Sequence, residues 1–355
     1  MRILALTRYE RLGSSSRVRF YQYIPYLTSQ GMEIVTAPFF DDGYVRKLYA
    51  GQRASPGVVL QAYLKRLSVL LRSASFDLLW VEKELLPWIP AWLENIVPTR
   101  QIPYVVDYDD AVFHRYDLHR FALVRALLGR KIDGVMRHAA LVIAGNQYLA
   151  ERARKAGAPR VECLPSVVDV NQYALTEPSE GHGFRIGWIG SPVTAPYLEL
   201  VREAVATLNR EIPLTITLIG AGSVQPFPNV PTEVLPWSEA IELKLSQQFD
   251  VGVMPLVDGP FERGKCGYKL IQYMASRLPV VASPVGVNQE IVEPQGNGYL
   301  AASSEEWLAA LRELRDSAEK RKMMGLAGRR KAEQKYNLRG TAPTLLSLLG
   351  SLTKP

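Results

Sequence analysis

The chain has 355 residues, 47% of them hydrophobic, and its 42 Lys and Arg outnumber 35 Asp and Glu to give a net charge of +7. This length and apolar content predict at least two domains with sizeable cores. No apolar run approaches the ~18–20 residues of a membrane-spanning helix, and MRILALTRYE begins a short strand rather than a signal peptide, so we expect a cytoplasmic protein. Cys163 and Cys266 are too few for a disulfide scaffold, and Cys266 is expected to be a small packing residue rather than a nucleophile.

The first half of the chain alternates short apolar runs with stretches of helical spacing. The runs are RILALT, MEIVTAPF, FDLLWVEK, IPYVVDYDD and ALVIAGNQ, at 2–7, 32–39, 76–83, 102–110 and 140–147. Strands that alternate with helices predict a parallel, doubly wound sheet. The loop after the first run contains GSSSR, in which Gly13, Ser14 and Ser15 could bind a phosphate or a sugar; an ordinary turn is the alternative.

The positive charge is concentrated in the first half. Residues 1–175 carry 23 basic and 16 acidic residues, so the rest of the chain is neutral overall. Two predicted amphipathic helices carry much of it: Lys65, Arg66 and Arg72 in 58–74, and Arg120, Arg125, Arg130, Lys131 and Arg137 in 118–139. A basic amphipathic face can dock on anionic lipid, although a solvated face is the alternative. We do not expect nucleic-acid binding, because aromatic residues do not alternate with the basic ones.

The alternation restarts after residues 174–183 and predicts a second doubly wound sheet. Its runs are FRIGWIGS, TITLIGAG, VLPW, FDVGVMPL and LPVVASPV, followed by a long helical region at 305–334 and the apolar segment TLLSLLGSL. We therefore place a first domain at 1–175, a linker at 176–183, a second domain at 184–340 and a C-terminal helix at 341–355. The absence of GxGxxG followed by a ribose-reading acid argues against a nicotinamide dehydrogenase.

Residues 254–291 combine a Gly- and Lys-containing loop, a helix start and a buried strand. Gly264 and Gly267 permit a close approach of the backbone to a ligand, and a helix from about 267 to 276 would point its N-terminal N–H groups at that loop. Lys265 and Lys269 add positive charge, and Glu290 follows the next strand at the carboxyl edge of the sheet. The segment therefore predicts an anion site that suits a phosphate.

These motifs resemble the family-4 group of retaining, nucleotide-sugar-dependent glycosyltransferases. The segments that carry the resemblance are the 261–291 block, RIGWIGSPVTAPYL, LTITLIGAGS, VLPWS and LPSVVDVNQY. The resemblance implies the GT-B architecture, with two facing Rossmann-like doubly wound parallel-sheet domains and a cleft between them. It also implies that the C-terminal helix returns to the first domain, that VLPWS with Trp237 forms the nucleobase loop, and that the donor phosphates lie near Gly190 and Ser191.

Two departures from the family pattern define a divergent subgroup. The usual Glu-x7-Glu pair falls on Gly264 and Gln272, and the usual Arg and Lys of the diphosphate site fall on Ser191 and on Thr194 or Ala195. Lys265 and Lys269 could replace those cations, Gln272 could bind a ribose hydroxyl, and Glu262 could supply a carboxylate from a shifted position. Loss of activity is the alternative that these departures leave open.

The DYDD sequence at 107–110 supplies the candidates for acid–base chemistry. Asp109 or Asp110, at a strand end, could accept the proton of an acceptor hydroxyl, and His114 could position the sugar. Asp107 and Asp109 also resemble the Asp-x-Asp that binds Mg²⁺ or Mn²⁺ in single-domain sugar transferases. Because those enzymes have one mixed sheet and no second Rossmann-like half, we favour a site without metal.

The sequence thus predicts a metal-independent glycosyltransferase that transfers a sugar, with retention, from a nucleotide-diphosphate donor to a hydroxyl of a glycan, polysaccharide or lipid-linked acceptor. It would need no cofactor and would act in the cytoplasm or at the inner face of the cytoplasmic membrane. A nucleotide-sugar epimerase and a non-catalytic nucleotide- or glycan-binding protein are the alternatives. The predicted catalytic residues are Asp109, Asp110, His114, Lys265 and Lys269. The predicted donor contacts are Gly13, Ser14, Ser15, Gly190, Ser191, Trp237, Glu262, Gly264, Gly267, Gln272 and Glu290.

Overall fold

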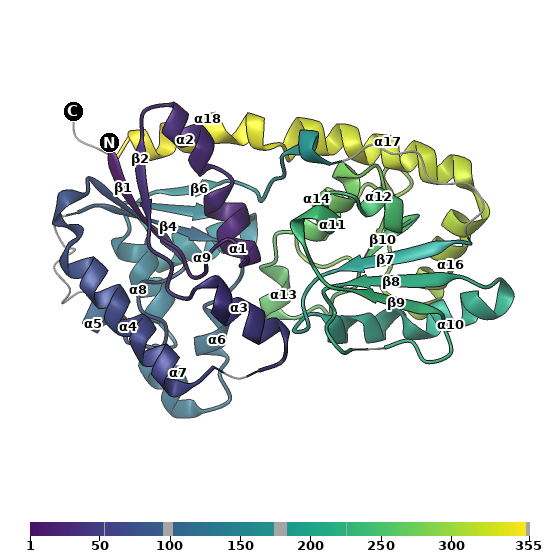
Figure 1. Ribbon diagram of the computed structural model, residues 1–355, viewed down its shortest axis with the longest axis horizontal. Helices are drawn as coiled ribbons and strands as arrows, with labels where there is room; N and C mark the ends of the chain where they lie inside the picture. Colours follow the sequence, from purple (N-terminus) through teal and green to yellow (C-terminus); the bar gives the residue numbers. More distant parts are fainter. Residues whose placement is uncertain (53, 95–101, 174–182, 225, 353–355) are drawn as a thin grey trace. The chain divides into compact units, whose positions relative to one another are not determined.

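The computed structural model describes residues 1–52, 54–94, 102–173, 183–224 and 226–352, and the chain forms two compact units (Figure 1). Unit 1 comprises Met1–Ser166, Arg263–Cys266 and Leu338–Pro355, and unit 2 comprises Val167–Glu262 and Gly267–Asn337. The division between Ser166 and Val167 precedes the predicted linker at 176–183, of which only the last residue lies in the described ranges.

Unit 1 contains a six-stranded parallel sheet in the order β2-β1-β3-β4-β5-β6. Its strands are β1 Arg2–Leu6, β2 Glu33–Thr36, β3 Leu78–Glu82, β4 Tyr104–Tyr108, β5 Leu141–Ala144 and β6 Val161–Cys163. The chain goes from β1 to one side and then crosses to β3 on the other, so the strand order reverses at the β1/β3 edge. Such a switch point opens a ligand-binding crevice at the carboxyl ends of the strands.

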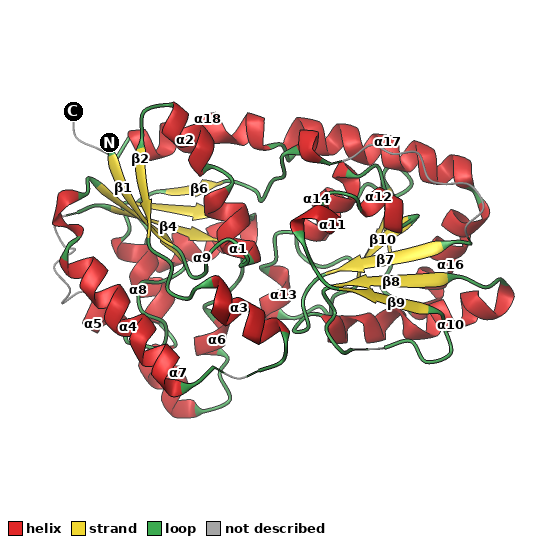
Figure 2. Ribbon diagram, viewed as in Figure 1, coloured by secondary structure: helices red, strands yellow, loops and turns green. Residues whose placement is uncertain are grey.

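Helices surround this sheet (Figure 2). They are α1 Ser14–Ser16, α2 Ile24–Ser29, α3 Asp42–Tyr49, α4 Pro56–Leu71, α5 Ala91–Glu94, α6 His114–Asp117, α7 Ala122–Leu128, α8 Lys131–His138, α9 Gln147–Ala156 and α18 Leu338–Gly350, with a π-helical turn at Arg17–Tyr21. Helix α18 packs on α2, where the hydroxyl groups of Tyr23 and Thr341 are 3.2 Å apart.

Two of the predicted surface cations of unit 1 are internal. Arg66 of α4 is 3% exposed and donates a 2.7 Å hydrogen bond to the carbonyl of Thr7, so it does not belong to a basic outer face. Lys131 of α8 is also buried, and its ammonium lies 2.7 Å from Glu84 and 3.0 Å from Glu94. The prediction that both residues contribute to a docking face is wrong, because helical spacing alone does not show which charges find internal partners.

Unit 2 contains a second six-stranded parallel sheet, in the order β12-β11-β10-β7-β8-β9. Its strands are β7 Arg185–Ile189, β8 Thr215–Ile219, β9 Thr232–Leu235, β10 Val251–Met254, β11 Val280–Ala282 and β12 Gly298–Leu300. The order reverses between β7 and β10, which is the strand order of a dinucleotide-binding Rossmann sheet. The two sheets and their helices confirm the predicted α/β class.

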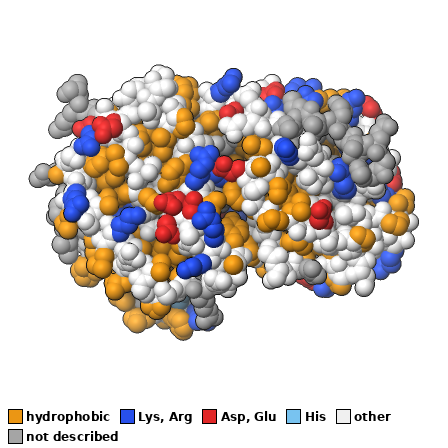
Figure 3. Space-filling model, viewed as in Figure 1, with side chains coloured by type: hydrophobic (Ala, Val, Ile, Leu, Met, Phe, Trp, Pro, Cys, Tyr) orange, Lys and Arg blue, Asp and Glu red, His pale blue; other side chains and the backbone are white. Residues whose placement is uncertain are grey.

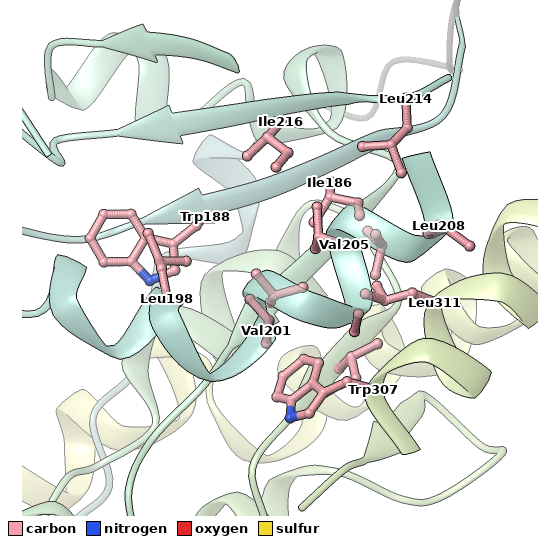
Figure 4. Close-up of a cluster of buried hydrophobic side chains, with 14 of the residues drawn as sticks. Ile186, Trp188, Leu198, Val201, Val205, Leu208, Leu214, Ile216, Trp307 and Leu311 are labelled. Atoms are coloured by element: carbon pink, nitrogen blue, oxygen red, sulfur yellow. The ribbon is translucent and has the colours of Figure 1, made fainter. Parts of the chain in front are cut away.

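The core of unit 2 lies between the sheet and the helices that follow β7 and β12. Trp188 and Ile216 of the sheet pack with Leu198, Val205 and Trp307 of those helices (Figure 4). The helices are α10 Arg202–Glu211, α11 Glu239–Glu242, α12 Leu245–Gln248, α13 Pro260–Arg263, α14 Tyr268–Ala275, α15 Asn288–Ile291, α16 Ser304–Asp316 and α17 Ala318–Lys335, with 3₁₀ turns at Val170–Gln172 and Ala195–Val201. Among the described residues, no helix combines the length and the apolar character that crossing a bilayer requires.

Candidate functional site

The loop after β1 forms one side of the switch point in unit 1. Gly13 precedes α1, and a Cβ at this position would lie 2.3 Å from the Cβ of Tyr9, so only glycine lets the loop fold this closely on itself. Ser14 is exposed, whereas Ser15 accepts a 3.3 Å hydrogen bond from Lys83. Ser16 is buried and donates to Glu82 at 2.6 Å, which fixes the loop to the end of β3.

Lys83, directly after β3, is the centre of a charged cluster. Its ammonium lies 2.8 Å from Asp109 and 3.4 Å from Asp110, and its backbone has a φ of 65°. Burial favours the neutral amine, but the two carboxylates raise the pKa of Lys83 overall. Burial likewise opposes the ionised form of Asp109, yet Lys83 and Ser15 lower the pKa of its carboxyl. The cluster therefore holds a carboxylate and an ammonium, both charged, at the carboxyl edge of the sheet.

Asp107 points to a different partner from Asp109. The Arg19 guanidinium binds Asp107 in a fork, with distances of 2.7 and 3.2 Å, and also donates to the carbonyl of Leu164 at 2.9 Å. Asp107 and Asp109 are thus each paired with a cation from the protein. Within the described ranges, no three His, Cys, Asp or Glu side chains gather so that they could hold a metal ion.

The segment Arg263–Cys266 belongs to unit 1 and packs on the ends of β4 and β5. Asn146, the N-cap of α9, donates to the carbonyls of Gly264 and Lys265, both at 3.0 Å. A Cβ on Gly264 would lie 2.4 Å from that of Ala111, so a larger residue here would push the segment away. Lys265 reaches to 3.9 Å from Asp110. Cys266 is buried, which raises the pKa of its thiol and makes it unreactive.

His114 is held in place by both of its ring nitrogens. Nδ1 lies 2.8 Å from Asp117, and Nε2 lies 2.9 Å from the hydroxyl of Tyr148. This anchoring fixes the orientation of the ring, so a role in positioning a ligand is more consistent with its contacts than proton transfer.

In unit 2 the switch point lies at the glycine turn after β7. Lys269 of α14 lies 4.4 Å from the Trp188 ring centroid and 3.4 Å from the hydroxyl of Thr194. A Cβ on Gly190 would lie 2.3 Å from the Trp188 ring and 2.8 Å from the ammonium of Lys269. Ser191 donates its N–H to Thr194 at 3.2 Å, which shapes the turn. The structure thus brings Gly190, Ser191 and Lys269 together, whereas Lys265 belongs to unit 1.

Helix α14 begins as the sequence predicts, at a glycine in the left-handed region. Gly267 has a φ of 63° and precedes the first turn, which contains Lys269. Gln272, by contrast, is 2% exposed and its amide donates to the hydroxyl of Tyr173 at 3.5 Å. The ribose contact of Gln272 therefore stays a prediction, for a side chain that is buried and bound to Tyr173. Glu290 lies in α15 with an exposed side chain; its backbone N–H donates to the carbonyl of Val287 at 3.0 Å, and its carbonyl accepts from Lys331 at 2.8 Å.

Two carboxylates of unit 2 accept hydrogen bonds from aromatic side chains. Trp237 follows β9, is half-buried, and donates from Nε1 to the buried Glu242 at 2.8 Å. Tyr268 donates to the same carboxylate at 3.4 Å. Glu262 of α13 accepts a hydrogen bond from Tyr197 and so has a fixed partner within its own unit.

Sequence reasoning missed Lys83, although a signal was present. Lys83 is the last residue of the apolar run FDLLWVEK. Because the carboxyl ends of parallel strands meet at one edge of a sheet, a lysine at the end of this run is expected to lie close to the DYDD sequence. Its positive φ and its contact with Asp109 depend on tertiary structure and have no local sequence pattern.

Comparisons with known proteins concern the family and the fold. Residues 183–317 match the family model described as Glycosyl transferases group 1. Spore coat protein SA of Bacillus subtilis (strain 168) is 35% identical over 78 residues, 21% of this chain and 21% of that protein, so the match spans about a fifth of its relative.

Solved structures share the whole fold at low sequence identity. The HepE protein of Anabaena, in complex with UDP, is 16% identical with a TM-score of 0.71 and covers 99% of this chain and 100% of its own. The sucrose-phosphate synthase of Thermosynechococcus elongatus is 16% identical with a TM-score of 0.73, and covers 99% of each chain. These matches confirm the predicted resemblance at the level of a group 1 domain and the GT-B fold.

Proposed function

Since residues 183–317 match the group 1 glycosyltransferase domain in a chain with the GT-B fold, we propose that this protein transfers a sugar from a nucleotide-diphosphate sugar to an acceptor hydroxyl. The proposal rests on the position of Lys269. Its ammonium lies with Gly190 and Thr194 at the β7/β10 switch point, inside the matched domain. An ammonium there, at the start of a helix, is placed to neutralise a diphosphate.

Unit 2 would bind the donor. As the sugar–phosphate bond breaks, negative charge grows on the departing diphosphate, and Lys269 together with the N-terminal N–H groups of α14 would stabilise it. Ser191 would contribute its hydroxyl beside the glycine turn, and Trp237 would lie against the nucleobase, held by its bond to Glu242.

Unit 1 would bind the acceptor. Asp110 is the more accessible carboxylate of the cluster, with a side chain 25% exposed against 13% for Asp109, and is the better candidate to take the proton of the attacking hydroxyl. Asp109, ionised and held by Lys83, would orient Asp110 and the loop with Ser15.

The transfer would proceed without a metal ion and with retention of the anomeric configuration. Metal independence is supported by the partners of the Asp-x-Asp pair, because Arg19 and Lys83 already neutralise Asp107 and Asp109. The acceptor would be a glycan, a polysaccharide precursor or a lipid-linked sugar, and unit 1 would act at an anionic membrane surface.

A thermal-shift screen with UDP-, GDP-, dTDP- and ADP-sugars tests donor binding. Since HepE was solved with UDP and with UDP-glucose, UDP-sugars are the first choice. A donor at 100 times its Kd should add about 2.7 kcal/mol of stability. Lys269→Ala should lose this gain, whereas Lys322→Ala, an exposed lysine of the same unit, should keep it. Equal shifts in the two variants would remove Lys269 from the donor site.

The replacement of the Glu-x7-Glu pair favours a second candidate function, a non-catalytic nucleotide- or glycan-binding protein. Gly264 and Gln272 occupy the predicted positions of the two glutamates, and Gln272 is buried. Such a protein would bind the nucleotide in the thermal-shift screen but release no nucleoside diphosphate when incubated with donor and acceptor. Release of the diphosphate would decide for the transferase.

A further inference from the structure

Unit 1 exposes large apolar side chains on two neighbouring helical segments. On α4, Leu60 and Leu64 are 61% and 58% exposed; on α7, Leu123 and Leu127 are 70% and 63% exposed. Hydrophobic side chains gather in Figure 3 over the lower left part, where Figure 1 labels α4 and α7. Single exposed leucines are ordinary on soluble proteins, but a group of them on adjoining elements indicates a binding surface.

The exposed apolar residues of α4 form a stripe opposite to its buried face. Leu60, Leu64 and Leu71 repeat at intervals of four and seven residues, which places them on one side of a helix, and all three are exposed. The buried residues of this helix, Ala62, Arg66 and Leu70, lie on the other side. The outer stripe is therefore not part of the core of unit 1.

Helix α7 is exposed on nearly all sides. Leu128 is its one buried residue, so the leucines of this short helix are not explained by packing. The preceding segment continues the surface: Phe121 lies 5.4 Å from His119, and His119 lies 5.8 Å from Trp88, as ring-centroid distances. The hydroxyl of Tyr63 on α4 binds the carbonyl of Pro87 beside that tryptophan. The two apolar segments are thus linked through residues 87–88.

The charge around this surface has one sign. No Asp or Glu occurs between Asp42 and Asp77 or between Asp117 and Asp133, the stretches that contain α4 and α7. Exposed basic side chains flank the leucines instead, among them Lys65, Arg72, Arg120 and Arg130. An apolar face bordered by cations matches a bilayer with anionic head groups, because the leucines and aromatic rings can enter the acyl boundary while the cations remain at the phosphates.

We propose that this surface, formed by the outer faces of α4 and α7 with Trp88 and residues 118–121, docks unit 1 on an anionic lipid bilayer by inserting its apolar side chains. The proposal deepens the membrane-surface part of the proposed function and rests on it; because docking requires neither donor nor acceptor, its failure would leave sugar transfer unaffected. It also differs from docking by charge alone: apolar insertion persists when salt screens the charges, whereas a purely electrostatic contact does not.

The test is flotation of the full-length protein with vesicles of phosphatidylcholine and phosphatidylglycerol. We expect binding at 0.1 M NaCl that weakens but survives at 1 M, where the Debye length falls to about 3 Å. Leu123→Gln combined with Leu127→Gln should reduce the bound fraction about tenfold. The matched control, Ile212→Gln with Met323→Gln, changes two exposed apolar residues of unit 2 and should bind like the parent. Lys65→Gln with Arg72→Gln should reduce binding at low salt only.

A second measurement uses the protein's own tryptophans. Trp88, in the proposed surface, is 47% exposed, whereas Trp80, Trp188 and Trp307 are buried. Brominated acyl chains should therefore quench the fluorescence of the parent, and Trp88→Phe should reduce the quenching. A parent that stays unbound at low salt, that is released completely at 1 M salt, or that binds without quenching would overturn the proposal. Self-association that the leucine pair abolishes, without vesicle binding, would instead assign the surface to a second copy of the chain.

Discussion

The Lys83→Met variant isolates the charge at the centre of the unit 1 cluster. Methionine keeps the length of the side chain, and, like lysine, it bears the cost of a positive φ, so the change removes the ammonium and little else. The lysine and Asp109 side chains are only 6% and 13% exposed, so their interaction is poorly screened by water. Breaking such a buried pair typically costs about 3–5 kcal/mol. Because Lys265 lies 3.9 Å from Asp110 and can compensate in part, we expect about 3 kcal/mol.

The loss should depend on pH. In the parent, Lys83 lowers the pKa of Asp109, so the stabilisation is complete above the unfolded-state pKa of about 4 and is lost as pH falls through the lower folded-state value. In the variant, burial raises the pKa of Asp109 without the opposing ammonium, and only the Ser15 hydrogen bond and Arg19 still lower it, so the acid takes up a proton more readily when the protein is moved toward pH 4. The difference in free energy of unfolding between parent and variant should therefore be largest at pH 7–8 and should shrink toward pH 4.

Urea unfolding, followed by tryptophan fluorescence at pH 8, 6 and 4.5, measures this difference. Lys65→Met, at an exposed lysine of the same unit, is the control and should change stability by less than about 0.5 kcal/mol. Adding Asp109→Asn to Lys83→Met should recover part of the loss, because the unpaired carboxylate is gone. A loss below about 1 kcal/mol at pH 8, or a loss that does not change with pH, would refute the view that Lys83 holds a buried carboxylate in its ionised form.

Three further predictions concern the proposed donor site and metal independence. Gly190→Ala should destabilise unit 2 by about 1–3 kcal/mol and weaken donor binding, because its Cβ would meet the Trp188 ring at 2.3 Å; Gly340→Ala, which meets nothing within 4 Å, is the control in the same unfolding and thermal-shift assays. Nucleotide binding should quench the fluorescence of the parent but not of Trp237→Phe, and equal quenching would mean that Trp237 only packs. Sugar transfer should survive EDTA and gain nothing from Mn²⁺; loss on chelation with rescue by Mn²⁺ would favour the Asp-x-Asp metal site.

The fold could be predicted from the sequence because the patterns that indicate strands and helix starts are local. Apolar runs such as RILALT and LPVVAS became parallel strands with a neighbouring strand on both sides, and Gly267 with the following residues became the predicted helix start. These features depend on side-chain periodicity and on backbone conformation, which neighbouring residues largely determine.

The site was less predictable because it depends on which distant residues meet. Helical spacing put Arg66 on an outer face, but the long side chain turns inward to the carbonyl of Thr7. The sequence predicts one anion site with both Lys265 and Lys269, yet Lys265 joins the Asp110 cluster of unit 1 while Lys269 lies beside Trp188 in unit 2. No spacing rule distinguishes two lysines four residues apart when the chain changes unit between them.

The position of α18 in unit 1 has a consequence for synthesis on the ribosome. Residues of unit 2 occupy most of the chain between Val167 and Asn337, and α18, which follows them, buries Leu345 and Leu349 in unit 1. During translation, the six strands of unit 1 emerge first, but its last helix emerges only after the whole of unit 2. Until α18 is made, the surface of α2 that it covers stays exposed in the nascent first unit. About 170 residues are added in that interval, which at 5–20 residues per second takes roughly ten to thirty seconds. That interval is when this protein is most exposed to chaperones and to aggregation.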